Sequence, residues 1–115
     1  MFVSHITSIP GVRLEGTGIV NAMKQSLIGP AQGWDGWSMR LFTLAEGGQT
    51  PRHSHPWPHI NYIVGGQGTL FLGGQEQPVQ TGSIAYIPGG EEHQFRNISG
   101  QDFAFICIVP AEADK

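Results

Sequence analysis

The stretch PRHSHPWPH, residues 51–59, holds three of the five histidines of the chain. Side chains at alternate positions of an extended segment point to the same face, so the rings of His53 and His55 can reach one point. The two prolines between His55 and His59 lack an amide proton and favour a turn, which keeps the third ring nearby. Neutral imidazole is the commonest metal ligand among side chains. The stretch therefore predicts a site for a transition-metal ion.

Two regular blocks surround these histidines and a fourth, His93. Residues 47–66 read as glycine, five residues, His-x-His, three residues, histidine, six residues and glycine. Residues 82–97 read as glycine, five residues, proline, a glycine at position 90, two residues, histidine, three residues and asparagine. The two blocks resemble the paired motifs of the cupin superfamily. One position departs from the common pattern, because His59 stands where most cupins have glutamate, and this resembles the small single-domain four-histidine cupins, including manganese-type members.

The resemblance implies an all-β fold, the double-stranded β-helix or jelly-roll barrel of cupins. It implies one divalent transition-metal ion per chain as cofactor, with manganese favoured and iron, nickel, copper, zinc and cobalt as alternatives. It also implies a homodimer that associates through the outer sheets. The four ligands that it implies are His53, His55, His59 and His93.

The composition also indicates a small β-barrel and excludes several kinds of partner. A chain of 115 residues makes one domain with a real core. Charged residues are 13% of it, the net charge is −3, and no cluster of Lys and Arg is present to bind nucleic acid or an anionic membrane surface. The longest apolar run, Phe103–Val109, is too short to cross a bilayer. The start shows no secretory signal and Cys107 is the only cysteine, so we expect a cytoplasmic protein.

Glycine and proline separate short runs that are rich in Ile, Val, Phe, Tyr and Leu, a pattern typical of short antiparallel strands. No window has helical periodicity. We expect residues 1–37 to form N-terminal strands and a loop of the same domain, with a dimer contact, and residues 38–115 to form the barrel core. The predicted strands are 19–23, 38–44, 49–55, 60–64, 69–72, 83–87, 93–97 and 103–109.

Strand parity predicts which side chains share the cavity with the metal. Phe95 lies two residues after His93 and faces the same side. We place the face of the last strand that carries Phe105 and Cys107 toward the metal by resemblance, although an apolar strand can also be buried on both faces. With Phe42, these side chains predict a cavity for a small apolar or aromatic molecule. Two charged side chains are candidates to support the ligands or bind an anionic group: Glu92 and Arg40.

Four neutral imidazoles leave a divalent ion with its full charge, and they supply no ligand carboxylate to act as a base. If the geometry is octahedral, two positions stay open for substrate, water or oxygen. The sequence favours a metalloenzyme of the oxygenase type, like a metal-dependent dioxygenase, acting on a small apolar or aromatic substrate. The alternatives are a noncatalytic ligand-binding or regulatory cupin with a structural metal, and a metal-dependent isomerase or lyase.

Overall fold

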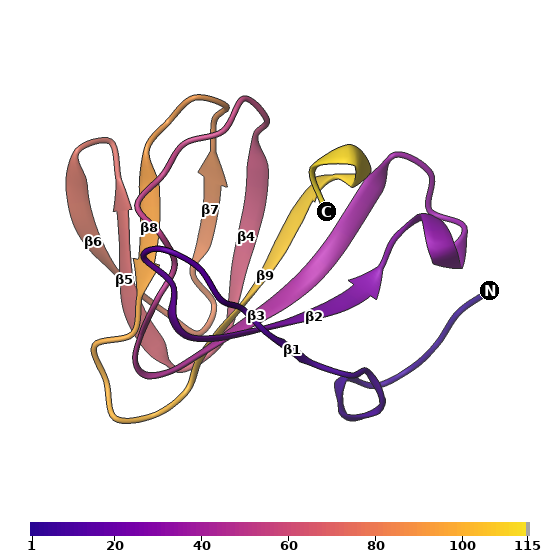
Figure 1. The fold of residues 1–115 in the computed structure, drawn as a ribbon, viewed down its shortest axis with the longest axis horizontal. Helices are drawn as coiled ribbons and strands as arrows, with labels where there is room; N and C mark the ends of the chain where they lie inside the picture. The colour runs from indigo at the N-terminus through magenta and orange to yellow at the C-terminus, as the bar shows by residue number, and fades with distance from the viewer. Residues whose placement is uncertain (115) are drawn as a thin grey trace.

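The computed structural model describes residues 1–114, and they form a protein built almost wholly of β-strands (Figure 1). The helical segments of this part of the chain are three single 3₁₀ turns, η1 (Ile6–Ser8), η2 (Pro30–Gln32) and η3 (Ala111–Ala113). None of the helices in it is long and apolar enough to cross a membrane. The predicted all-β fold class is confirmed. The nine strands are β1 (Val12–Arg13), β2 (Val20–Ile28), β3 (Trp37–Gln49), β4 (His59–Gly65), β5 (Gln67–Leu72), β6 (Gln75–Gln80), β7 (Ile84–Ile87), β8 (His93–Arg96) and β9 (Phe103–Pro110).

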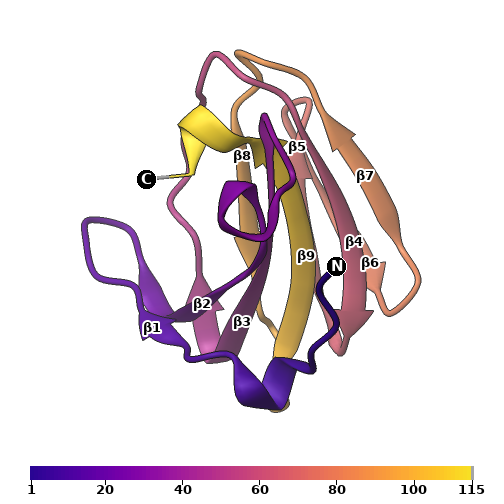
Figure 2. The ribbon, with the colours of Figure 1, turned by 90° about the vertical axis from the view of Figure 1, so that its right-hand side faces the viewer.

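Strand β3 organises the sheet because it pairs along both of its edges. It runs antiparallel to β2 and to β9, and its last residue, Gln49, also pairs with Arg96 of β8. The resulting order is β6-β5-β8-β3-β9-β4-β7, with β2 and then β1 added beside β3. The sheet curls into a half-barrel whose concave side lies between the β8–β5–β6 part and the β3–β2 part (Figures 1 and 2). Residues distant in sequence thus face each other across the interior.

An aromatic cluster fills part of the interior of the half-barrel. Buried and less buried residues alternate along β9, so Phe103 and Phe105 point inward, as parity requires. The ring of Phe95 stacks on that of Phe105 with centroids 4.0 Å apart, and Leu44 and Ile63 pack into the same core. Burying one side chain of this size stabilises the fold by about 1.5–3 kcal/mol. This core fixes the relative positions of β8 and β9 beneath the cavity described below.

The predicted strand 49–55 is wrong. Strand β3 ends at Gln49, and an irregular segment then leads to β4. Prolines in this segment remove amide donors, so it cannot form a continuous ladder. Its strand-like pairing is one isolated bridge, in which His53 and His93 exchange backbone hydrogen bonds of 3.1 and 2.9 Å.

Two observed strands have no counterpart in the sequence analysis. Strand β1 has only two residues, too few for a periodic signal. Strand β6 has the sequence QEQPVQ, which lacks the alternation of apolar and polar residues that predicts a half-buried strand. It pairs with β5 alone, and such an edge position accommodates Pro78, because an edge strand can have amides that pair with nothing.

The N-terminal segment extends the sheet and crosses its convex face. The side chain of Gln25 on β2 donates hydrogen bonds from Nε2 to the carbonyls of Ile6 and Ile9, at 2.8 and 2.9 Å. Farther along this face, β4 and β7 expose large apolar side chains, including Tyr62 and Ile84. The expected homodimer, with a contact through residues 1–37, stays a prediction.

Replacing Gly68 with alanine tests the close packing of β5 against the core. A Cβ atom there would lie 2.4 Å from the carbonyl oxygen of Arg96 and 2.6 Å from the ring of Phe103. We expect Gly68→Ala to lower the free energy of unfolding by about 1–3 kcal/mol, the usual cost of overpacking. Urea unfolding measures the change. Gly100→Ala is the control, since the nearest atom to its Cβ would be 3.9 Å away; equal stability of the two variants would contradict this packing.

Candidate metal centre

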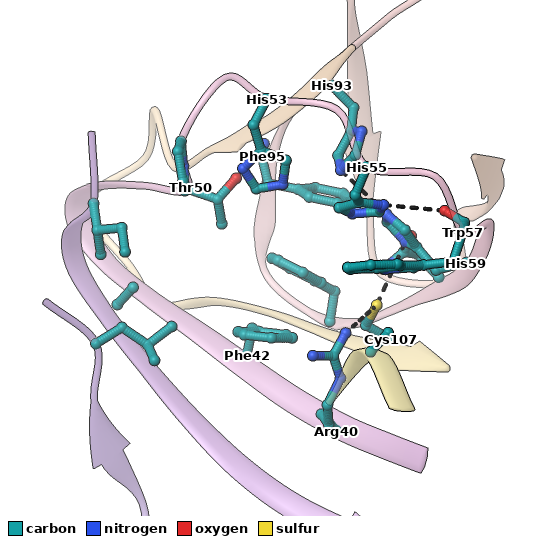
Figure 3. Close-up of a pocket in the computed structure, with 17 residues that line it drawn as sticks. Arg40, Phe42, Thr50, His53, His55, Trp57, His59, His93, Phe95 and Cys107 are labelled. Carbon is teal, nitrogen blue, oxygen red and sulfur yellow. Dashed lines mark hydrogen bonds between the residues drawn. The ribbon is translucent and has the colours of Figure 1, made fainter. Parts of the chain in front are cut away.

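Four histidine rings converge at one end of the concave side of the sheet (Figure 3). His53 and His55 come from the irregular segment, His59 begins β4, and His93 begins β8. The ring centroids of His53, His55 and His59 lie between 4.8 and 4.9 Å from that of His93. The structure therefore brings together all four histidines that the sequence singled out.

The irregular segment is fixed where it crosses the Pro88–Gly90 turn. The amide of Gly90 donates to the carbonyl of His55 at 2.7 Å. A Cβ atom at Gly89 would lie only 2.3 Å from the carbonyl oxygen of Pro56, so the two backbones can approach this closely only because the residue is glycine. The turn residues of the second sequence block thus position a histidine of the first.

The spacing of the donor atoms fits a shared metal ion. One ligand atom from each of His53, His55 and His93 lies within 4.8 Å of the others, and Nε2 of His59 is 3.2 Å from Nε2 of His93. Imidazole nitrogens bind transition metals at about 2.0–2.1 Å, which puts two ligands at a right angle about 3 Å apart. The separation of 3.2 Å between His59 and His93 is close to that value.

Hydrogen bonds fix the tautomers of three of these rings. Nδ1 of His55 lies 3.0 Å from the carbonyl of Trp57, and Nδ1 of His93 lies 2.8 Å from the carbonyl of Glu91. A carbonyl oxygen only accepts, so each Nδ1 carries the proton and each Nε2 keeps its lone pair. Nδ1 of His59 likewise donates to Oδ1 of Asn61 at 2.7 Å, because the amide nitrogen of Asn61 is used in a bond to the carbonyl of Ile106.

The environment favours the neutral form of three of the four histidines, His53, His59 and His93. Burial, with the neighbouring rings of His93 and His55, lowers the pKa of His53 from 6.5 to about 4. Burial and the same neighbours lower the pKa of His59 to about 3, although its bond to Asn61 acts in the opposite direction. Burial also lowers the pKa of His93. At neutral pH these nitrogens are therefore ready to bind a cation without first losing a proton.

The histidines line a cavity of about 250 Å³ that is otherwise mostly apolar (Figure 3). The four side chains predicted for the cavity, Phe42, Phe95, Phe105 and Cys107, all line it. Burial raises the pKa of the Cys107 thiol, which stays neutral, and its sulfur lies 3.4 Å from Nδ1 of His59. A cavity of this kind suits a small, largely apolar ligand.

Several lining residues were not singled out from the sequence. Trp57 stacks on the ring of His55, with centroids 4.6 Å apart and planes 11° apart. Asn61 lies two residues after His59 on β4, so strand parity is a signal that could have identified it. No signal in the sequence indicates that Leu14 and Ile19, in the connection between β1 and β2, and Ala22 of β2 line the cavity.

The two charged side chains predicted to support the site lie in different places. Glu92 is exposed, and the structure gives its carboxylate no hydrogen bond to an imidazole among residues 1–114; the backbone carbonyl of Glu91 has that role for His93. Arg40 lines the cavity, and its Nη2 donates to the sulfur of Cys107 at 3.0 Å. Arg40 thus reaches His59 through the thiol rather than directly.

Comparison with known proteins identifies the family. The model of the Cupin_2 family, a cupin domain, matches residues 40–109, more than half of the chain. This chain is a cupin. The resemblance seen in the two sequence blocks is thereby confirmed, and the cluster of histidines has the location and donor chemistry of a possible metal site.

Individual relatives place the cupin among proteins with several different activities. Among curated proteins, 1-methylthio-D-xylulose 5-phosphate methylsulfurylase of Rhodospirillum rubrum is 30% identical over 111 residues, covering 92% of the cupin and 70% of the relative. Among solved structures, the polyketide cyclase RemF from Streptomyces resistomycificus has a TM-score of 0.90 and 29% identity, covering 96% of the cupin and 80% of the cyclase. A cupin-2 domain protein of Rhodospirillum rubrum has a TM-score of 0.81 and 26% identity over 93% of the cupin and 71% of that chain.

Removing single histidines tests the metal centre. Protein purified without added metal is expected to carry about one divalent ion per chain, and His55→Ala and His93→Ala are each expected to carry almost none, because each loses a ligand. Elemental analysis measures the content, and circular dichroism checks the fold. His5→Ala is the control, since His5 is exposed and lies outside the cluster. Metal that persists in both cluster variants would contradict this site.

The lowered pKa values predict how the stability of the metal-free cupin depends on pH. The folded pKa of His53 and His59 lies below the ordinary value of 6.5, so the unfolded chain binds more protons between about pH 3 and 6.5. The free energy of unfolding is therefore expected to be highest above pH 6.5 and to fall as the pH falls toward 4. Urea unfolding at pH 7 and pH 5 measures this. His59→Asn is expected to reduce the change in the free energy of unfolding between pH 7 and pH 5, and His5→Asn is expected to leave it unchanged. The same change in both variants would contradict the assignment of this pH dependence to the buried histidines.

Proposed function

We propose that this cupin is a metal-dependent enzyme that acts on a small, largely apolar or aromatic substrate bearing a carbonyl group. The observation that supports this most is the convergence of four imidazoles, three of them with lowered pKa values, on an apolar cavity with room for a small molecule beside them. His53, His55, His59 and His93 would hold the ion. Manganese is the favoured metal because of the resemblance to the four-histidine cupins. Iron, nickel, copper, zinc and cobalt are the alternatives, and imidazole suits zinc, copper, iron and nickel.

When bound, a divalent ion at this site supplies a Lewis acid that polarises an oxygen atom of the substrate. The protein's own contributions are binding and orientation. The carbonyls of Trp57 and Glu91 and the amide of Asn61 hold three imidazoles with Nε2 free. Apolar side chains such as Phe42 and Phe105 bind the body of the substrate and exclude water.

A reaction that does not consume oxygen is favoured by the donor set. Four neutral ligands cancel none of the ion's charge, so the ion is a strong Lewis acid and resists oxidation. The similarity to a polyketide cyclase over 96% of the chain supports the same class, a cyclisation or isomerisation of a carbonyl compound. An oxygenase of dioxygenase type, which the sequence favoured, is the second candidate, because the aromatic and apolar lining also suits the aromatic substrates of such enzymes.

Proton exchange in a carbonyl substrate tests the proposal. The probe is a set of aryl 1,3-diketones, whose central carbon loses a proton faster when a carbonyl oxygen is polarised. In deuterated buffer without oxygen, the metal-loaded cupin is expected to accelerate exchange about tenfold or more over the same concentration of free metal, a gain that needs only about 1.4 kcal/mol of stabilisation. Nuclear magnetic resonance follows the exchange.

The controls separate the candidate functions. His93→Ala is expected to lose the acceleration and His5→Ala to keep it. Conversion of the diketones that requires oxygen would overturn the favoured class and support the oxygenase. If the metal-loaded protein shows no exchange and no conversion, this result would contradict an enzymatic role. A noncatalytic, ligand-binding cupin would then remain.

A further inference from the structure

Arg40 is a nearly buried cation that has fewer hydrogen-bond partners among residues 1–114 than it has donors. Its side chain is 13% exposed, and a guanidinium has five N–H donors. Nη2 donates to the neutral thiol of Cys107 at 3.0 Å, and Nη1 lies 3.4 Å from Oδ1 of Asp114. Nε is buried and has no hydrogen-bond partner in the part of the chain that the structure describes. Buried charged groups are costly unless their donors are satisfied, so this arrangement favours an additional acceptor.

In the described part of the chain, the ion pairs around Arg40 leave one positive charge unmatched. Oδ1 of Asp114 is 2.5 Å from Nζ of Lys24 but 3.4 Å from Nη1 of Arg40, so the carboxylate is mainly the partner of the lysine. The Lys24 and Asp114 side chains are 18% and 13% exposed, so water screens this group weakly. Within residues 1–114, two cations therefore share one carboxylate beside the cavity. A single additional negative charge would neutralise the group.

The surroundings of Arg40 favour an organic monoanion over a free inorganic ion. The guanidinium carbon lies 5.0 Å from the ring centroid of Phe42, which stacks on Phe105 with centroids 5.6 Å apart (Figure 3). An anionic group at Arg40 would thus have apolar ring surface next to it. The sulfur of Cys107 links Arg40 to Nδ1 of His59, at 3.0 and 3.4 Å, so the anionic end of a ligand would lie near the histidine cluster.

We propose that Arg40 binds the carboxylate of a small aromatic or aliphatic carboxylic acid in this cavity, and that the Lys24–Asp114 pair holds the guanidinium in position. A guanidinium fork matches the two oxygens of a carboxylate, which explains the choice of arginine here. The inference rests on the proposed function only in naming this acid as the substrate. Binding itself requires Arg40 and not the metal.

Calorimetric titration with phenylacetate, benzoate and hexanoate tests the subsite, on metal-loaded protein and again after chelation. At least one acid is expected to bind both the metal-loaded and the chelated protein. The neutral amide of that acid is expected to bind with an affinity at least about tenfold lower. Arg40→Gln is expected to weaken binding of the acid by a similar factor. Arg52→Gln is the matched control, because it removes the same charge from an exposed arginine that stacks on Phe71, with its guanidinium carbon 3.7 Å from the ring centroid, outside the cavity.

Arg40→Lys keeps the charge and replaces Arg40→Gln in the test if circular dichroism shows that Arg40→Gln does not fold. Arg40→Lys is expected to bind the acid more weakly than the wild type and more strongly than Arg40→Gln. Unchanged binding in both Arg40 variants, equal weakening in Arg52→Gln, or no binding of any acid would overturn the proposal. Loss of binding on chelation would place the carboxylate on the metal instead, and tighter binding of phenyl phosphate than of phenylacetate would overturn the preference for a monoanion. Binding that depends on Arg40 in a protein without diketone exchange would leave this inference intact while the proposed function fails.

Discussion

The reciprocal backbone hydrogen bonds between His53 and His93 are the contact on which the site depends. They join residues forty positions apart in the sequence, at 3.1 and 2.9 Å, and they are the only strand-like bridge of the irregular segment that carries two of the histidines. Because prolines prevent a longer ladder there, the segment is positioned by a few specific contacts: this bridge, the bond from Gly90 to His55, and the close approach permitted at Gly89. The position of the rings therefore follows from local backbone geometry as much as from the barrel.

The cavity combines a set of imidazole donors with a cation, Arg40, that shares its one carboxylate partner among residues 1–114 with Lys24. Carbonyl and amide acceptors hold the imidazoles with Nε2 free, and burial lowers the pKa of His53, His59 and His93. On the other side of Cys107, Arg40 lines the same cavity, and its contact with the carboxylate of Asp114 is long, at 3.4 Å. A ligand that carries both an anionic group and a polarisable oxygen would satisfy both features at once, which links the proposed reaction class to the proposed subsite.

Much of the fold and of the cavity follows from the sequence, and the exceptions have physical causes. Strand parity places Phe95 with His93 and Phe105 with Cys107, because successive side chains of a strand point to opposite faces. The strand predicted at 49–55 fails because proline outweighs the apparent alternation of the His-x-His stretch. The rings still converge, since an extended segment with one bridge also directs alternate side chains to one side. Contacts between distant segments, such as Arg40 with Asp114 and the lining by Leu14 and Ile19, depend on how the sheet curls and carry no local signal.

The most direct test of the account is to count the ligands on the metal in the protein as isolated. X-ray absorption spectroscopy distinguishes imidazole from sulfur and from simple oxygen ligands, through the multiple scattering of the ring. The account predicts four imidazole ligands and no sulfur in the first coordination shell. A first shell with three or fewer imidazoles, or one that includes the sulfur of Cys107, would contradict the claim that these four histidines bind one ion.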